Sequence, residues 1–198
     1  MIVGYDAKRA FHNDSGLGNY SRSLIRAIQK TRREASYVLF NPKTPVKFSD
    51  FYNPAISTVI EPKGIYSKAH PYWRSFKIAD KFDELGIDVY HGLSGEIPSN
   101  IKRNVLSVVT IHDIIFIRFP ELYAAADRFI YKKKLFSAIK HADIIVATSE
   151  QTKNDLIELC HAPSEKIHVI YQTCQDIFFE AGKAKKSNYL ENPYFLSV

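Results

Sequence analysis

Four short segments of the sequence place polar side chains beside apolar runs or helix-like stretches, where ligands are commonly bound. The first, Gly16-Leu17-Gly18-Asn19, precedes a helix-like stretch. Its glycines let a ligand approach the backbone closely, and the N-terminus of a helix offers unpaired N–H groups and a partial positive charge to a phosphate. A plain tight turn would explain the same residues. Ser21 stands where a dinucleotide fingerprint needs its third glycine, so that fingerprint is absent.

The second segment is the pair His112-Asp113, which ends the apolar run 108–111. A histidine here could donate a hydrogen bond to a substrate hydroxyl or stabilise developing charge, with Asp113 or a carbonyl group fixing its tautomer. The alternative is structural, in that His112 ends a strand and satisfies a neighbouring carbonyl group. No second ligand stands at a metal-binding spacing from His112, so we expect no metal site.

The third segment carries His91, Ser94 and Glu96 in a small polar loop that follows the apolar pair Val89-Tyr90. These side chains could form hydrogen bonds with a polyhydroxylated ligand, such as a sugar. A bare turn between two strands would account for them equally well. The three residues are therefore candidates for acceptor binding.

The fourth segment, Thr148-Ser149, ends an apolar run and begins a helix-like stretch. A hydroxyl side chain in this place suits the N-cap of a helix, which explains the segment without a function. The sequence contains no Walker loop and no Ser-His-Asp order. The chain by itself therefore offers few side chains for catalysis.

The elements that must position these segments alternate between strands and helices. Apolar runs that indicate strands occupy residues 2–5, 37–40, 57–60, 89–90, 105–111, 144–148 and 167–171, and helix-like stretches occupy residues 19–31, 71–85, 127–141 and 151–160. The apolar runs are nearly continuous, which is typical of parallel strands covered on both faces. We expect a Rossmann-like, doubly wound α/β fold with a mainly parallel sheet, helices on both faces, and ligand loops at the carboxyl ends of the strands.

Composition narrows the class of protein and of ligand. The chain has 198 residues and a net charge of +6, which would suit a phosphorylated small molecule, an anionic membrane surface or nucleic acid. The densest basic groups lie in helix-like stretches and could simply be solvated, and no nucleic-acid-binding motif is present, so we expect no nucleic acid partner. No apolar run approaches the roughly 20 residues of a membrane span, and the start lacks the order of a signal peptide, which predicts a cytoplasmic protein. Cys160 and Cys174 are expected to be reduced thiols.

A change of composition near the end predicts a domain boundary. We expect residues 1–180 to form an amino-terminal domain and residues 181–192, which include Gly182, to form a linker. Residues 193–198 have the composition of a buried strand, which we interpret as the first strand of a second domain that is missing from this chain.

Taken in order, these segments resemble the amino-terminal domain of the retaining glycosyltransferases of family 4, especially the mannosyltransferase-like branch. The resemblance rests on the residues 16–20, 90–94 with Glu96 and Pro98, 110–113 followed by Phe119-Pro120, 142–149, 166–172, 176–178 and 193–198. Each match is loose alone, but their order and spacing are specific. One departure is Gln172-Thr173, where many members have Asn-Gly.

The resemblance implies an enzyme of the GT-B type, with an acceptor held mainly by this domain and a nucleotide sugar held mainly by a second domain. It places Gly16, Leu17, Gly18 and Asn19 against the donor diphosphate and sugar. It also places His112 beside the donor sugar, next to Asp113, and implies that neither a metal nor another cofactor is required. The sugar is passed on with retention of its configuration.

We therefore expect the chain to fold by itself and to transfer no sugar, because cationic groups for the leaving diphosphate belong to the second domain. The acceptor is expected to be a glycan or a lipid-linked sugar used in polysaccharide biosynthesis, with a peripheral contact to the inner face of the membrane. The alternative is a non-catalytic module that binds a glycan or lipid acceptor. A nicotinamide-dependent oxidoreductase would share the fold but lacks the fingerprint.

Overall fold

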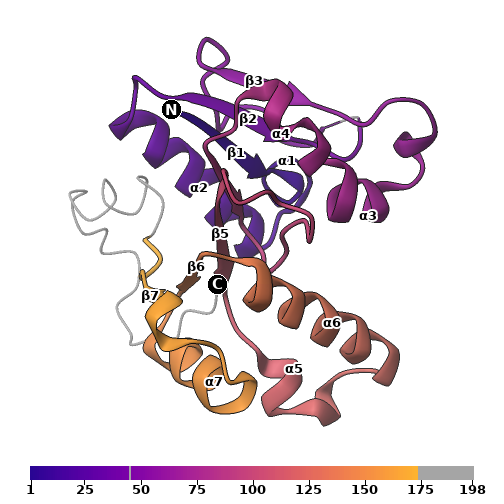
Figure 1. Ribbon diagram of the computed structural model, residues 1–198, viewed down its shortest axis with the longest axis vertical. Coiled ribbons are helices and arrows are strands. Elements are labelled where there is room, and N and C mark those ends of the chain that lie inside the picture. The colour runs from indigo at the N-terminus through magenta and orange to yellow at the C-terminus, as the bar shows by residue number, and fades with distance from the viewer. Residues whose placement is uncertain (45, 174–198) are drawn as a thin grey trace, which may run out of the picture.

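The computed structural model describes residues 1–44 and 46–173, which contain one seven-stranded sheet (Figure 1). All strand pairs are parallel, in the order β3-β2-β1-β4-β5-β6-β7. The strands are β1 (Ile2–Asp6), β2 (Ser36–Phe40), β3 (Ser57–Ile60), β4 (Val89–Gly92), β5 (Leu106–Ile111), β6 (Ile144–Ala147) and β7 (Ile167–Val169). The predicted doubly wound α/β fold is confirmed, and the order of the strands reverses between β1 and β4. The predicted limit of the first domain at residue 180, the linker 181–192, the strand 193–198 and Cys174 lie outside the described residues.

The helices follow the predicted pattern, with additions. The α-helices are α1 (Lys8–His12), α2 (Gly16–Thr31), α3 (His70–Tyr72), α4 (Phe82–Leu85), α5 (Ile115–Arg118), α6 (Ala125–His141) and α7 (Glu150–Cys160). Shorter turns are η1 (Gly64–Ser67), η2 (Trp73–Lys77), η3 (Ala79–Lys81), η4 (Pro120–Leu122) and η5 (Ser164–Lys166), of which η2 is a π-turn and the others are 3₁₀ turns. The stretch 71–85 is helical as predicted but changes type along its length. Helices α1 and α5 were not predicted, because five and four residues are too few to show a helical period.

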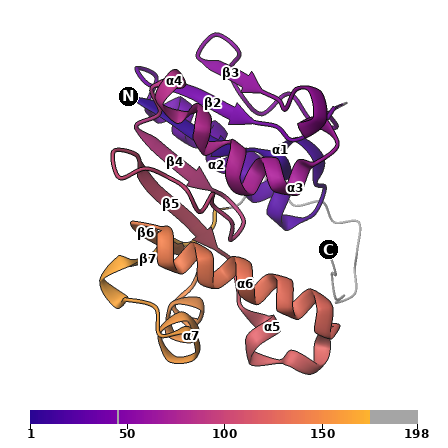
Figure 2. The same cartoon turned by 45° about the vertical axis from the view of Figure 1, so that its right-hand side comes forward.

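Two apolar cores hold the helices against the sheet. On one face, Tyr37 and Leu39 of β2 share a core with Phe11 of α1 and Ile25 of α2. On the other face, alternate residues of the strands form a larger core with the run α3–α4 and with α6 and α7 (Figure 2). Burial on both faces explains the nearly continuous apolar runs. Among the described helices, none is long and apolar enough to cross a membrane.

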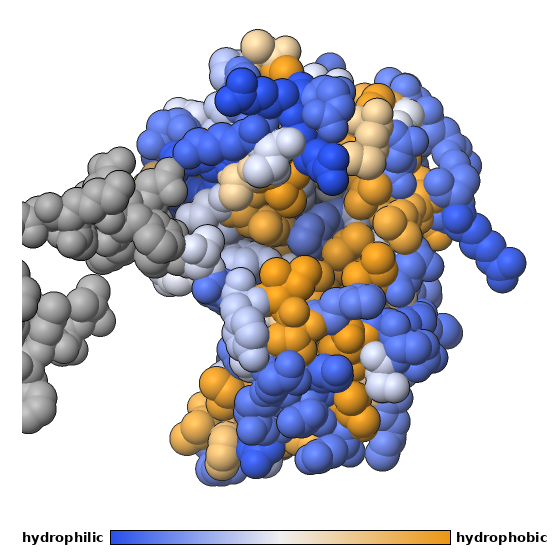
Figure 3. Space-filling view, turned by 90° about the vertical axis from the view of Figure 1, so that its left-hand side faces the viewer, coloured by the Kyte–Doolittle hydropathy of each residue, from blue (hydrophilic) through white to orange (hydrophobic). Residues whose placement is uncertain are grey.

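Helix α2 covers one face of the sheet over β1 and β2. No described helix covers the same face over β5–β7. Leu106 of β5 and Ile170, just after β7, are 42% and 55% exposed there. Figure 3 shows hydrophobic side chains gathered at mid-height of the molecule on the side that carries α2 and α7. The described part of the chain therefore leaves one half of one sheet face open to solvent.

The predicted cap of α7 is confirmed. The Oγ of Ser149 accepts a hydrogen bond of 3.1 Å from the N–H of Thr152, which satisfies one of the unpaired amides at the start of the helix. The hydroxyl of Thr152 donates in turn to the carbonyl oxygen of His112 at 2.9 Å. This contact fixes the end of β5 to the start of α7.

Candidate glycosyl-transfer site

A cavity of about 270 Å³ lies at the carboxyl edge of the sheet and collects residues from three of the predicted segments. Its lining includes Leu17, Ser94, Glu96, His112 and Asp113. The carboxyl ends of parallel strands meet at one edge, so segments up to about a hundred residues apart come together there. Further lining residues are Arg9, Gly95, Ile111, Phe116, Tyr123, Tyr131, Lys134 and Leu135. The predicted residues Gly16, Gly18, Asn19 and His91 are not among those that line the cavity.

His112 is half-buried, and both of its ring nitrogens are engaged. Nε2 lies 3.0 Å from the carbonyl oxygen of Leu93, and Nδ1 lies 2.9 Å from the side-chain nitrogen of Gln172. A carbonyl oxygen can only accept, so the proton is on Nε2, and Nδ1 is left as an acceptor. Tyr20 packs edge-on against the ring at 4.6 Å between centroids. Burial lowers the pKa of His112, although the bond to Leu93 and the charge of Asp113 act in the opposite direction, so the ring is neutral near pH 7.

Asp113 does not hold the tautomer of His112. Its Oδ1 accepts a hydrogen bond of 3.2 Å from the N–H of Ile115, at the start of α5. The tautomer is held by the carbonyl of Leu93, which is the second of the two possibilities that the sequence left open. Asp113 still lines the cavity and brings a negative charge to its wall.

The glycine segment forms the first turn of α2, which begins at Gly16 rather than at Asn19. Ser15 before it is extended, with φ −76° and ψ −179°, and its carbonyl accepts from the N–H groups of Gly18 and Asn19 at 3.0 and 3.1 Å. A Cβ at Gly18 would lie 1.9 Å from the carbonyl oxygen of Asn13, whereas a Cβ at Gly16 would meet nothing within 4 Å. Packing within the chain therefore requires glycine at position 18, and of the two glycines only Gly16 borders open space.

The polar loop after β4 is held tightly to its neighbours. A Cβ at Gly92 would lie 2.0 Å from the carbonyl oxygen of Glu96, so the loop closes on itself there. The N–H of Gly95 donates to the carbonyl oxygen of Thr110 at 2.8 Å, which joins the loop to β5. Ser94 and Glu96 thus reach the cavity wall from a rigid turn.

A chain of charged side chains, buried at its Asp6 and Arg74 end, lies beneath this loop. Arg74 of η2, 7% exposed, pairs with Asp6 at the end of β1, and its Nη1 lies 3.3 Å from Oε2 of Glu96. The other carboxylate oxygen of Glu96 accepts a 2.9 Å hydrogen bond from Nζ of Lys134 in α6. Burial acts to lower the pKa of Arg74, but the carboxylates of Asp6 and Glu96 outweigh it and hold the pKa above its ordinary value. Glu96 therefore faces the cavity with its charge balanced by two cations.

His91 lies inside the sheet, 9% exposed, rather than on the cavity wall. Its Nε2 is 2.8 Å from Oγ1 of Thr110, which also contacts the hydroxyl of Tyr20 at 3.1 Å. Burial lowers the pKa of His91 to about 4, so the ring is neutral at physiological pH. His91 therefore supports Tyr20 through the hydroxyl of Thr110, and Tyr20 in turn packs against the ring of His112.

We expect the burial of His91 to make the folded chain sensitive to acid. Its pKa is 6.5 in an ordinary environment and about 4 here, so the unfolded chain binds more protons between these pH values. Stability should fall by about 3 kcal/mol as the pH drops through this window.

His91→Gln removes the titrating ring, and urea unfolding at pH 7 and pH 4.5 should show a smaller loss of stability than in the parent chain. His168→Gln, at an exposed position of β7, is the matched control and should keep the parent's pH dependence. An unchanged pH dependence in His91→Gln would contradict this assignment.

Several residues of the site were missed by sequence reasoning. Arg9 lies in α1, three residues after the end of β1, so the rule that ligand groups lie near the carboxyl ends of strands could have found it. The sequence carried no comparable signal for Arg74, whose partner Asp6 lies 68 residues away, or for Gln172, which lies 60 residues from His112. Contacts of this kind depend on the tertiary fold alone.

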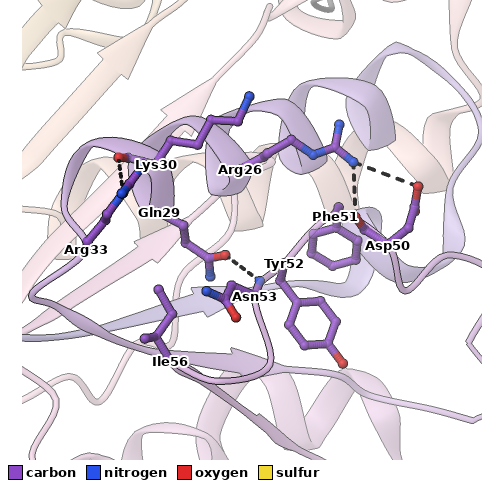
Figure 4. A pocket seen from close by; sticks show the side chains of 9 residues that line it. All are labelled: Arg26, Gln29, Lys30, Arg33, Asp50, Phe51, Tyr52, Asn53 and Ile56. Atoms are coloured by element: carbon purple, nitrogen blue, oxygen red, sulfur yellow. Dashed lines mark hydrogen bonds and ion pairs between the residues drawn. The ribbon is translucent and has the colours of Figure 1, made fainter.

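A second cavity, of about 460 Å³, lies between the carboxyl half of α2 and the residues 50–56. Figure 4 shows Gln29 directed at Asn53 and Arg26 directed at Asp50, and the corresponding distances are 2.8 Å to the N–H of Asn53 and 3.2 Å to the carbonyl oxygen of Asp50. None of the predicted site residues lines it. These contacts fasten the long connection between β2 and β3 to α2.

The comparison with known protein families identifies the chain. The model of Glycosyltransferase Family 4 matches residues 15–173, which include every predicted site residue. The chain belongs to glycosyltransferase family 4. A curated relative of this family 4 domain is the O-antigen chain mannosyltransferase B of Escherichia coli, 24% identical over 186 residues. The match covers 86% of this chain and 47% of the relative, so the family 4 domain spans about half of the relative's length.

Solved structures agree with the fold of this family 4 domain. A sucrose-phosphate synthase structure from Thermosynechococcus elongatus has a TM-score of 0.53 at 15% identity, and the match covers 92% of this chain and 96% of that one. A glycosyltransferase from Rickettsia africae ESF-5 has a TM-score of 0.50 at 12% identity, covering 93% of this chain and 46% of that one. At these identities the likeness establishes the fold, a Rossmann-like half of a GT-B architecture.

Proposed function

We propose that this family 4 domain is the acceptor side of a glycosyltransferase that moves a sugar, with retention, from a nucleotide sugar to a glycan or lipid-linked acceptor. The observation that carries the proposal is the cavity of about 270 Å³, which Leu17, Ser94 and His112 line together. The first turn of α2, a polar loop and a neutral histidine thus meet at one place. The same cavity admits a sugar ring and leaves its hydroxyl groups near hydrogen-bonding side chains.

The residues of the cavity have distinct roles in this proposal. The Nδ1 of His112 accepts a hydrogen bond from a substrate hydroxyl once the exposed side chain of Gln172 moves aside. Arg9 and Lys134 supply positive charge to a phosphate group, as does the amino-terminal end of α2. Ser94 donates to a hydroxyl of the acceptor. No resident metal or other cofactor takes part.

The proposed division of labour leaves the nucleotide mainly to a second domain. The relative from Escherichia coli is about twice as long as the matched region, which is consistent with such a domain. The proposed setting is polysaccharide biosynthesis in the cytoplasm, at the inner face of the membrane. A non-catalytic acceptor-binding module is the competing function, favoured by the small number of catalytic groups in this chain.

The test compares the 198-residue chain with the product of the whole reading frame. We expect the chain alone to bind UDP- and GDP-sugars with a Kd of roughly 1 mM, because one wall of a cleft leaves most of the ligand exposed. The 198-residue chain should release no nucleotide in a coupled assay, whereas the full-length protein should transfer sugar. Micromolar binding or sustained turnover by the chain alone would overturn the division of labour. A full-length protein that binds the acceptor but transfers no sugar would favour the non-catalytic binding module.

A further inference from the structure

Exposed apolar side chains are concentrated in one region of the surface, which borders the cavity at Tyr131. Of the sixteen large hydrophobic residues exposed in the described chain, seven fall between positions 115 and 136. They are Ile115, Phe119, Leu122, Phe129, Ile130, Tyr131 and Phe136. Phe129 is 71% exposed and Leu122 is 68% exposed. Single exposed apolar residues are common, but a group of this kind marks an interaction surface.

Helix α6 presents two of these side chains on one face together with lysines. Phe129 and Phe136 are seven residues apart, and Lys133 and Lys140 follow each by four, so all four point to the same side of the helix. The opposite side is buried through Leu135, Ala138 and Ile139. We call Phe129, Lys132, Lys133, Phe136 and Lys140 the outer face of α6; all five are exposed.

The charges on the outer face have no acidic partner. Lys132, Lys133 and Lys140 form no ion pair with any residue in the ranges 1–44 and 46–173, whereas the neighbouring Lys134 is paired with Glu96. The acidic residues between positions 115 and 141 are Glu121 and Asp127. The outer face therefore alternates aromatic rings with positive charges that have no acidic partner among the described residues.

This combination fits a lipid surface better than a protein surface. Lysine is depleted in protein interfaces. At a bilayer surface, aromatic rings enter the boundary between headgroups and acyl chains, and lysine stems extend to anionic headgroups. We propose that the outer face of α6 docks on an anionic phospholipid bilayer.

The position of the outer face relates membrane docking to the proposed acceptor. Tyr131 and Lys134, from the adjacent side of α6, line the cavity that holds His112. An apolar hollow of about 340 Å³, lined in part by Phe76, Ile97, Phe129 and Ile130, opens between α6 and η2. Docking by the outer face thus brings this hollow to the membrane surface and the cavity close behind it. The inference rests on the proposed function, which sets the protein at the membrane, and it names the surface that makes the contact; vesicle binding is measured without sugar transfer, so the two can fail independently.

The experiment measures co-sedimentation of the 198-residue chain with vesicles. We expect binding to phosphatidylcholine vesicles that contain 30% phosphatidylglycerol, and at least tenfold weaker binding to phosphatidylcholine alone. Two variants should each weaken binding by about tenfold or more: Lys132→Gln/Lys133→Gln/Lys140→Gln, which removes the charges, and Phe129→Ser/Phe136→Ser, which removes the rings. All five side chains are exposed, so the melting temperature should be unchanged.

Matched controls come from exposed residues elsewhere on the chain. Lys43→Gln/Lys63→Gln/Lys68→Gln makes the same change in net charge, and Ile65→Ser removes an apolar side chain that is 77% exposed. Both should bind vesicles like the parent. If the lysine control lost as much vesicle binding as the α6 lysine variant, net charge alone would explain the binding, and the proposal would be overturned. Absence of vesicle binding would also overturn it, and self-association abolished by Phe129→Ser/Phe136→Ser would then assign the surface to a second copy of the chain.

Discussion

Replacing Gly18 with alanine is expected to lower the free energy of unfolding by about 3 kcal/mol, which is the upper range for forcing an extra methyl group into a packed site. The added Cβ would lie 1.9 Å from the carbonyl oxygen of Asn13. That oxygen accepts a 2.8 Å hydrogen bond from Nη1 of Arg22, which the collision would also displace. Chemical denaturation at pH 7, followed by circular dichroism, measures the loss.

Gly16 provides the matched control within the same helical turn. Its Cβ would meet nothing within 4 Å, and alanine is the better helix former, so Gly16→Ala should leave stability unchanged or raise it by up to about 1 kcal/mol. Equal stability of the two variants would show that the turn relaxes and that packing does not require glycine at position 18. Because a Cβ at position 16 meets open space, Gly16→Val should keep the fold, and a loss of donor use in that variant of the whole protein would report the donor contact that the family resemblance implies.

Replacing His112 with alanine is expected to lower turnover by about 100-fold or more in the whole protein, because a positioned polar contact to the reacting groups contributes ~3 kcal/mol. The ring lines the cavity, and its tautomer is fixed by Leu93, so Nδ1 is prepared to accept a hydrogen bond from substrate. Steady-state kinetics on the variant, with melting temperatures measured in parallel, provide the test. Unchanged kcat would remove His112 from the reaction.

The variant His112→Gln separates the catalytic role from the structural one. Its amide can still donate to the carbonyl of Leu93 but lacks a nitrogen acceptor in the place of Nδ1. We expect it to restore stability and not turnover. Recovery of both would mean that His112 serves only to satisfy Leu93. In the proposed reaction the neutral ring is the active form, and burial lowers the pKa of His112, so acid should inhibit turnover at a pH below the ordinary pKa of histidine.

Much of this protein could be predicted without its structure. The strands, the parallel sheet and helices α2, α6 and α7 follow from apolar periodicity, which local sequence carries. The convergence of Leu17, Ser94 and His112 also follows, since parallel strands place their carboxyl ends at one edge. The family follows from the order of loose motifs along the chain. Each of these inferences uses residues that are close in sequence or a rule that holds for every doubly wound sheet.

The tertiary structure alone decided which of the candidate residues line the cavity. Position 18 needs glycine because Asn13 lies against it, and His91 is withdrawn into the sheet to support Thr110 and Tyr20. Likewise, only the folded chain brings Gln172 to the ring of His112. A residue type and its place at a strand end specify the chemistry that is available there. Which atoms remain free to perform it depends on hydrogen bonds and contacts between segments far apart in sequence, and these contacts exist only after packing.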